Sequence, residues 1–335
     1  MANIADAATS APSDAGRSQR RDWLIAPPMW TAEQVPRVYV APISFGLGDL
    51  VVSLPIVQAL VADSATSGGE TWLVARSASQ ALLSERIPGL AGWVDEETFR
   101  PVPGIDRVVD LRDHPLQKDH WWGSPEFEAA LGPLDINQVL ERIASDFGID
   151  ADFSGPTPLQ CSPVPGLDHT VLLVTETDGP AKAWPATKWE VLAAELRRHF
   201  DVRQVTRTLA AGALDLLGAP ALALSNPGAA VDAFSSCRGV IGIDTGLTHL
   251  AVQQRAPTVT ICRHGSVYFR PWSHARALRG APCDDACLAE ERASAYNDRV
   301  SLRGFRWRPR TCPSGQRCLA ELQPEQAVRL FEELA

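Results

Sequence analysis

Short apolar strands alternate with helical segments along most of this 335-residue sequence, and this alternation constrains the fold more than any other feature. Strand patterns at residues 37–43 and 71–75 are each followed by a helical pattern. Beyond a proline-rich segment the alternation restarts at residues 169–174 and continues to residues 257–262. Because strands that alternate with helices form parallel sheets covered by helices, we expect an α/β fold with two Rossmann-like domains.

The proline-rich segment divides the chain into two parts. Four prolines fall between residues 156 and 165, so we predict a linker at residues 156–168. The N-terminal domain would then span residues 31–155 and the C-terminal domain residues 169–335. Residues 1–30 are rich in Ala, Ser and Asp and then basic, and they hold too little apolar surface to form a core. We expect them to be a disordered tail.

The composition is that of a soluble globular protein, with 45% apolar and 21% charged residues. No uninterrupted apolar run approaches the roughly 18 residues that span a bilayer, so we expect no transmembrane segment. The N-terminus lacks the apolar core of a secretory signal. We therefore expect a cytoplasmic protein whose seven cysteines are thiols or metal ligands rather than disulfides.

Negative charge is concentrated in the first half of the chain. The net charge is −9, and residues 31–150 contain eighteen acidic and eight basic residues. This excess argues against nucleic acid or an anionic membrane surface as a partner. The alternative is that the carboxylates only keep the surface soluble.

Residues 240–251 form the most informative single stretch. An apolar run ends in Asp244-Thr245-Gly246, and a helical pattern that contains His249 follows at once. Asp244 or Thr245 would cap the helix, and Gly246 would let a ligand approach the backbone. Free N–H groups at such a helix start bind phosphate. The alternative is an ordinary strand–turn–helix unit with a capping aspartate.

A second turn of this kind follows the first strand. Gly46 and Gly48 permit a tight turn, and Asp49 would lie in the first turn of the next helix, at the positive end of its dipole. The turn is not a dinucleotide-binding fingerprint, because Val51 stands where the third glycine belongs. On this motif alone Asp49 is better explained as a capping residue than as a catalyst.

Four separated motifs together resemble glycosyltransferase family 9, the bacterial heptosyltransferases. They lie at residues 44–55, 182–189, 240–259 and 312–325, in the order the family has them, and the resemblance covers roughly residues 37–335. It implies a GT-B fold, in which two Rossmann-like domains face a central cleft. The donor nucleotide sugar, usually ADP-heptose, would bind the C-terminal domain and the acceptor the N-terminal domain. It also implies inverting sugar transfer without a metal cofactor.

The resemblance also assigns roles to individual residues. Asp49 matches the general base, and Lys182 matches the lysine that meets the donor diphosphate. Asp244 matches the carboxylate that binds sugar hydroxyls. The remaining residues implied on the donor side are Thr175, Thr177, Thr245 and Gly246. We add Gly48, whose turn leaves the backbone open to a ligand, and Arg263, which could reach a phosphate although its segment departs from the family pattern.

Two segments depart from the family pattern. Residues 207–211 stand where the family has a glycine-rich turn, so the contacts to the nucleotide base are not assigned. Residues 263–268 replace a Gly-Pro-Thr-x-Pro segment, so the identity of the donor is not assigned either. His249 lies inside the helix and is better explained as a packed, hydrogen-bonded residue than as a catalyst.

The acceptor side offers one aromatic motif. Trp121 and Trp122 beside His120 could stack on a sugar ring, or could be a surface patch folded onto the core. The acidic first half would repel a polyanion. We therefore expect a neutral or cationic acceptor, either a small molecule or a protein side chain, rather than an anionic lipid.

Four cysteines form two pairs near the C-terminus. Cys283 and Cys287 have C-x3-C spacing, and Cys312 and Cys318 have C-x5-C spacing. Four thiolates could hold zinc or iron, but these are not the strong C-x2-C pairs, and unligated thiols are the alternative.

Two other functions stay open. A GT-B relative could epimerise or hydrolyse a nucleotide sugar, and a catalytically silent relative could only bind one. Release of ADP without an acceptor would indicate hydrolysis, and binding without turnover would indicate the silent protein.

Overall fold

The computed structural model describes residues 35–114, 135–157, 159–177, 182–206, 218, 221–263, 269–270, 272–281, 312 and 315–335. The N-terminal tail expected at residues 1–30 lies outside these residues.

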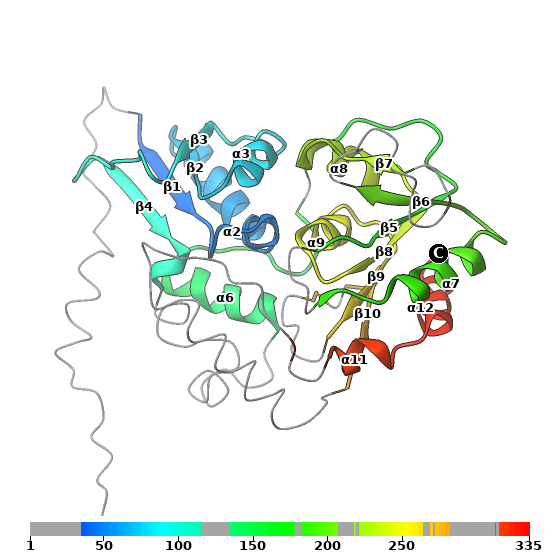
Figure 1. Cartoon of the computed structure of the whole chain (residues 1–335). Coiled ribbons are helices and arrows are strands. Elements are labelled where there is room, and N and C mark those ends of the chain that lie inside the picture. Colours follow the sequence, from blue (N-terminus) through cyan, green and yellow to red (C-terminus); the bar gives the residue numbers. More distant parts are fainter. Residues whose placement is uncertain are drawn as a thin grey trace, which may run out of the picture.

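The first half is built on a parallel sheet with the strand order β3-β2-β1-β4. Its strands are β1 (Arg37–Ala41), β2 (Glu70–Ala75), β3 (Gly92–Asp95) and β4 (Asp106–Asp110). Its helices are α2 (Leu47–Thr66), α3 (Ala78–Ser84), the 3-10 turn η1 (Leu111–Asp113) and α6 (Ile136–Asp146). β1 lies between β2 and β4 in this sheet (Figure 1). The strand order therefore reverses at β1, and open α/β sheets commonly bind ligands at the carboxyl ends of the strands at such a point.

The second half is built on a six-stranded parallel sheet with the order β10-β9-β8-β5-β6-β7. Its strands are β5 (Thr170–Val174), β6 (Asp201–Thr206), β7 (Leu222–Ala223), β8 (Gly239–Ile243), β9 (Thr258–Cys262) and β10 (Ala275–Arg279). Its helices are α7 (Ala186–Leu196), α8 (Pro227–Phe234), α9 (Gly246–Gln253), α11 (Arg317–Ala320) and α12 (Pro324–Glu332). All residues of β5, β8 and β9 are buried, as expected for strands covered on both faces.

Local sequence explains where several helices begin. Asp135 accepts a hydrogen bond from the backbone N–H of Gln138 at the start of α6, and the Gln138 side chain accepts one from the backbone of Asp135 in return. Asn226 caps α8 in the same way by accepting from the N–H of Ala229, and Pro227 follows at the first helical position.

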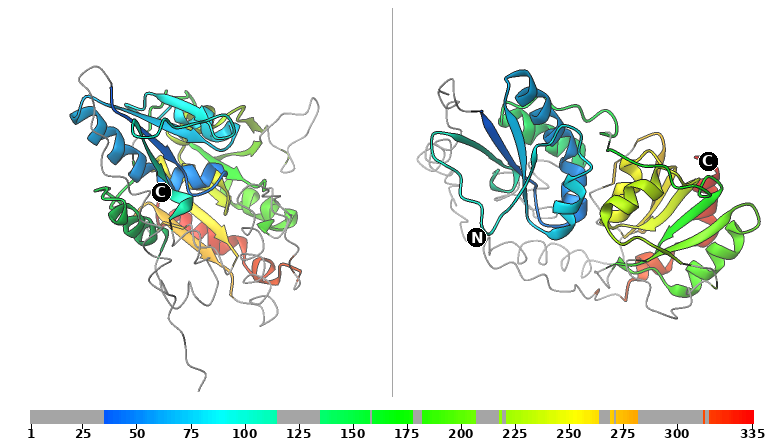
Figure 2. Two further views of the ribbon diagram at one scale, coloured as in Figure 1. Left: turned by 90° about the vertical axis from the view of Figure 1, so that its left-hand side faces the viewer. Right: turned by 90° about the horizontal axis from the view of Figure 1, so that it is seen from above.

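Helices from the two halves pack against each other. In Figures 1 and 2, α9 and α8 lie on the side of the second sheet that faces the first half, whereas α7 and α12 cover its other side. α2 packs on α9, and α3 packs on α8. One hydrophobic core runs through this contact, because Leu50 and Leu54 of α2 belong to the same buried cluster as Val231 of α8 and Leu250 of α9. The halves are therefore joined by an apolar interface.

Helix α2 is long and apolar enough to cross a membrane by length and composition. Of the window that meets this test, 61% is buried inside the protein, and Leu50, Val52 and Ile56 are fully buried there. α2 is thus accounted for as the core helix of the first half.

The C-terminal tail returns to the segment that begins α7. The indole of Trp184 donates a hydrogen bond to the carbonyl of Leu319 at 3.1 Å, and the ammonium of Lys188 donates to the carbonyls of Ala320 and Leu322, both at 2.5 Å. A Cβ on Gly280 would lie 2.5 Å from the carbonyl oxygen of Cys318, so this close approach requires glycine. These hydrogen bonds to the C-terminal tail therefore fix the position of the chain just after Lys182.

Candidate active site

The candidate site lies where α2 and α9 begin, because these two helix starts touch. A Cβ added to Gly48 would lie 3.4 Å from the Cα of Gly246 and 3.4 Å from Cδ2 of His249. A Cβ added to Gly246 would lie 2.8 Å from the backbone nitrogen of Gly48. The two glycine turns of the sequence thus meet across the interface between the halves.

Asp49 lies in the first turn of α2, as the sequence predicts. One of its carboxylate oxygens, Oδ2, accepts a hydrogen bond of 2.8 Å from the backbone N–H of Gly46, which precedes the helix. This bond fixes the side chain at the positive end of the helix dipole. Asp49 is partly buried, one residue beyond the Gly48–Gly246 contact.

Asp244 and Lys182 form an ion pair on the other side of the contact. The ammonium of Lys182 lies 3.2 Å from Oδ2 of Asp244 and also donates to its backbone carbonyl at 3.1 Å. The other oxygen, Oδ1, lies 2.9 Å from Nε2 of His249. The Asp244 side chain is only 5% exposed and that of Lys182 is 37% exposed, so the ammonium reaches solvent while the carboxylate does not.

Of the two residues expected to cap α9, Thr245 occupies the cap position, but its side chain makes no cap hydrogen bond. The carboxylate of Asp244 instead binds the ammonium of Lys182 and the imidazole of His249. His249 is packed and hydrogen-bonded, and its role of holding the carboxylate follows from its place one helical turn into α9.

The other residues expected on the donor side lie at strand ends of the second sheet. Thr175 and Thr177 follow β5, and Arg263 follows β9. The hydroxyl of Thr175 accepts a hydrogen bond of 2.7 Å from the amide of Gln204 on β6. Since β5, β8 and β9 are neighbours in the sheet, their carboxyl ends bring these residues to the edge that carries Asp244.

This geometry can stabilise negative charge. The N-termini of α2 and α9 meet at the Gly48–Gly246 contact, and the dipole of each helix makes its N-terminus partly positive. The ammonium of Lys182 adds a positive charge that is partly offset by its pairing with Asp244. Features of this kind favour an anionic ligand such as a phosphate.

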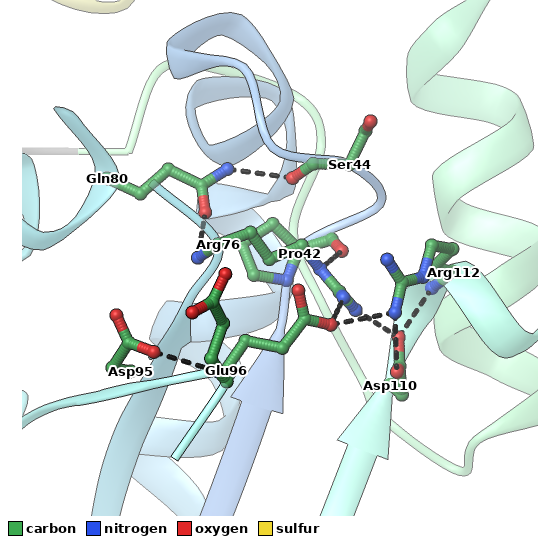
Figure 3. Close-up of polar contacts among 9 residues, drawn as sticks. Pro42, Ser44, Arg76, Gln80, Asp95, Glu96, Asp110 and Arg112 are labelled. Carbon is green, nitrogen blue, oxygen red and sulfur yellow. Dashed lines mark hydrogen bonds and ion pairs between the residues drawn. The ribbon is translucent and has the colours of Figure 1, made fainter. Parts of the chain in front are cut away.

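A network of charged residues lies at the carboxyl edge of the first sheet (Figure 3). The guanidinium of Arg76, whose side chain is 1% exposed, pairs with Glu96 and, at 2.6 Å, with Asp110. Arg112 lies 2.7 Å from the same Glu96 oxygen. Burial lowers the pKa of Arg76, and the charge of Asp110 opposes that shift. Sequence reasoning missed this network, although each member stands at or just after a strand end.

Sequence reasoning also missed Arg270, a buried residue that hydrogen-bonds to both halves. It is 3% exposed, it donates to the side-chain oxygen of Gln253 at 2.9 Å and to the carbonyl of Val52 in α2 at 2.5 Å, and it stacks on Trp272. Burial lowers the pKa of Arg270 to about 9. The residue therefore stays charged at neutral pH and ties α2 to the second half.

Several expected site residues lie outside the described part of the chain. These are His120, Trp121 and Trp122 of the aromatic loop, together with Cys283 and Cys287. Cys318 is buried in the second core, and the sulfur of Cys312 accepts a hydrogen bond of 3.2 Å from the N–H of Gln316. Among the described residues, no group of three or more His, Cys, Asp or Glu side chains is arranged to hold a metal.

Comparisons with known proteins agree with this geometry. The sequence profile described as glycosyltransferase family 9 (heptosyltransferase) matches residues 135–294, which contain Lys182 and Asp244. No curated protein matches the chain.

Solved structures share the fold across both halves. A glycosyltransferase family 9 structure from Veillonella parvula DSM 2008 is 14% identical, with a TM-score of 0.59 over 91% of this chain and 98% of its own. The heptosyltransferase WaaC of E. coli, solved with ADP-2-deoxy-2-fluoro heptose, is 14% identical, with a TM-score of 0.56 over 89% of this chain and 100% of its own. The iron-containing dodecameric glycosyltransferase TibC of enterotoxigenic E. coli is 17% identical, with a TM-score of 0.55 over 91% of this chain and 77% of its own.

Two parallel α/β halves that meet at paired helix starts have the GT-B fold of these structures. The family profile supports a glycosyltransferase that takes its sugar from a nucleotide sugar. This profile matches residues 135–294, just under half of the chain, and within that segment the similarity is to glycosyltransferase family 9.

Proposed function

We propose that this enzyme moves a heptose, or a closely related sugar, from an ADP-sugar to an acceptor hydroxyl by inverting, metal-independent transfer. The observation that carries the proposal is the contact between Gly48 and Gly246. It puts a carboxylate in the first turn of α2 next to the Lys182–Asp244 pair at the start of α9.

The proposed reaction is a single displacement. The acceptor oxygen attacks the anomeric carbon, its proton passes to the carboxylate of Asp49, and the bond from that carbon to the diphosphate oxygen breaks. The electron pair of the broken bond leaves with ADP. Because attack comes from the face opposite the leaving group, the anomeric configuration inverts. In this proposal Asp49 acts on the acceptor, because it belongs to the first half.

Charge on the leaving diphosphate is stabilised by Lys182 and the start of α9. Preorganised donors in a shielded site are a major source of transition-state stabilisation. Asp244 is already bound on both oxygens, by Lys182 and His249, so its role in the proposal is to hold the lysine and meet sugar hydroxyls. In this proposal the ammonium of Lys182 and the N–H groups at the start of α9 take the place of a divalent cation.

The identity of the donor rests on similarity. WaaC was solved with an ADP-heptose analogue, and TibC was solved with ADP-D-beta-D-heptose. By this similarity we propose ADP-heptose as the donor for this chain.

For the acceptor we propose a neutral or cationic molecule. Arg76 and Arg112, which stand at the carboxyl edge of the first sheet, are both paired with carboxylates of Glu96 and Asp110. A polyanion would have to compete with these carboxylates for the arginines. The excess of acidic residues in the segment 31–150 would also repel a polyanion.

The test is transfer from ADP-heptose to a panel of acceptors in the presence of EDTA. The panel contains Kdo₂–lipid A, amino sugars, aminocyclitols and serine- or threonine-containing peptides, with UDP-glucose as the control donor. We expect acceptor-dependent ADP release with ADP-heptose, unaffected by EDTA, and a product of opposite anomeric configuration by NMR. Retention of configuration, or loss of activity with EDTA, would contradict the mechanism. Transfer to the lipid alone would contradict the acceptor assignment, and ADP release without any acceptor would indicate a hydrolase.

The C-terminal cysteines have no part in the proposed reaction. TibC is described as iron-containing, and the thiols of Cys283, Cys287, Cys312 and Cys318 are of the kind that binds iron or zinc. Metal analysis of protein purified without a histidine tag decides whether they do. A stoichiometry near one would establish a structural metal, and a value near zero would leave them as thiols.

A further inference from the structure

The turn between β1 and α2 is held by one buried side chain, Gln80 of α3. Gln80 is 0% exposed. Its amide nitrogen donates to the carbonyls of Ser44, at 2.8 Å, and Gly46, at 3.0 Å. Its amide oxygen accepts from the backbone N–H of Arg76 at 2.9 Å. A buried amide without partners would be costly, so three bonds to backbone groups make this side chain a brace for the turn.

Gln80 and Asp49 are both hydrogen-bonded to the backbone of Gly46. The carbonyl of Gly46 accepts from Gln80, and the N–H of Gly46 donates to Oδ2 of Asp49 at 2.8 Å. Gly46 therefore links the Gln80 amide to the Asp49 carboxylate. The same carbonyl also accepts from the backbone N–H groups of Asp49, at 3.2 Å, and Leu50, at 3.4 Å, so Gln80 adds a side-chain bond to those of the first helical turn.

Arg76 fixes the other end of the brace (Figure 3). Its backbone N–H orients the Gln80 amide, and its Nε donates to the carbonyl of Pro42 at 3.0 Å. Its guanidinium pairs with Glu96 and Asp110, so one side chain just after β2 connects the carboxyl ends of all four strands of the first sheet. The turn that leads to Asp49 is therefore anchored to the sheet rather than to solvent.

We propose that Gln80 is a positioning residue for sugar transfer, which holds the Ser44–Gly46 turn so that the carboxylate of Asp49 meets the acceptor hydroxyl. This inference rests on the proposed role of Asp49 as the general base. Small displacements of a catalytic group are costly, since a misplacement of about 1 Å reduces rates by up to about 10²-fold. An amide is the group that fits, because it presents two N–H donors to the carbonyls and one oxygen to Arg76.

The test uses two substitutions of Gln80 and one matched control. Gln80→Met keeps the volume and removes all three hydrogen bonds. Gln80→Glu keeps an acceptor for Arg76 and removes the donors to Ser44 and Gly46. Gln58→Met is the control: Gln58 lies on α2 beyond Asp49, and its amide also donates to a backbone carbonyl, that of Pro88 at 3.2 Å. ADP affinity and the melting temperature are measured for every variant.

For both Gln80 variants we expect kcat to fall about 10- to 100-fold, with KM for ADP-heptose and ADP affinity within about twofold of wild type. Gln58→Met should lower the melting temperature and leave kcat near wild type. Wild-type kcat in both Gln80 variants would overturn the inference. So would an equal loss of kcat in Gln58→Met, because that would indicate general destabilisation.

Combination with Asp49→Asn separates this inference from the function on which it rests. If Gln80 acts through Asp49, Gln80→Met should have almost no further effect on transfer in the Asp49→Asn background. A full additional loss there would overturn the positioning role. High activity in Asp49→Asn alone would instead contradict the general base. Unchanged ADP affinity shows that each variant keeps a folded donor half.

Discussion

The pairing of Lys182 with Asp244 explains how a partly exposed ammonium is kept in one place. Two bonds to Asp244 hold it, and the clamp of Trp184 on the C-terminal tail holds the chain that carries it. We predict that Lys182→Met weakens ADP binding about 10- to 100-fold, because a hydrogen bond between charged groups contributes about 1.5–3 kcal/mol. Titration calorimetry with ADP measures this change.

A second lysine gives the matched control. Lys188 stands six residues further on and donates to the carbonyls of Ala320 and Leu322. Lys188→Met should lower the melting temperature but leave ADP affinity nearly unchanged. If ADP binds Lys182→Met as tightly as wild type, Lys182 does not contact the diphosphate.

At the scale of elements, the fit of α2 against α9 depends on Gly246. A Cβ there would lie 2.8 Å from the nitrogen of Gly48 and 2.9 Å from the Cβ of Leu47, and both lie at the start of α2. We predict that Gly246→Ala lowers the free energy of unfolding by about 1–3 kcal/mol, as overpacking does. It should also reduce transfer, because it pushes the two helix starts apart. Urea unfolding and initial rates measure the two effects.

Gly155→Ala is the control for this substitution. A Cβ on Gly155 meets no atom within 4 Å, so the change adds a methyl group in open space. It should change stability by less than about 1 kcal/mol and leave transfer intact. Full activity and stability in Gly246→Ala would show that the helix starts have room to separate.

Much of this architecture was predictable from local patterns. The strands at β3 and β8 and the glycine turns before α2 and α9 follow from apolar runs that end in glycine or polar residues. β10 was not predicted, because its Ala-Arg-Ala-Leu-Arg sequence at the sheet edge is only partly buried and lacks an apolar run. α12 was not predicted either.

The contacts of the site were less predictable, because they join residues far apart in the sequence. Family resemblance singled out Asp49 and Asp244, but nothing local indicates that Gly48 touches Gly246. The partners of Arg76 and Arg270 are equally non-local, at Asp110 and Val52. The sequence shows that a charged residue stands at a strand end, where sites often form. Only the fold shows which residue pairs with it.

At the scale of the whole molecule, buried histidines should make the folded protein less stable at acid pH. Burial lowers the pKa of His114, whose side chain is 6% exposed, although Asp146 opposes the shift. Burial also lowers the pKa of His274, which lies 2.8 Å from the carbonyl of Val252. Below about pH 6.5 the unfolded chain binds protons that the folded protein excludes. The stability that these histidines contribute is therefore complete above about pH 6.5 and is lost as pH falls through the folded-state pKa values.

This prediction is checked by urea unfolding at pH 7.5 and pH 5.5. We expect a lower free energy of unfolding at pH 5.5, and a smaller difference between the two pH values in a His114→Gln/His274→Gln variant. An equal pH dependence in the variant would assign the acid sensitivity to other groups.

The central claim is that Asp49 is the base that activates the acceptor while the second half holds the donor. The most direct measurement compares acceptor-dependent ADP release by wild type and Asp49→Asn, with ADP affinity measured in parallel. Asparagine keeps an oxygen that accepts from the N–H of Gly46, so the start of α2 is preserved. We predict that transfer falls by at least about 10²-fold while ADP affinity stays within about threefold of wild type. Near-normal transfer by Asp49→Asn would contradict the account.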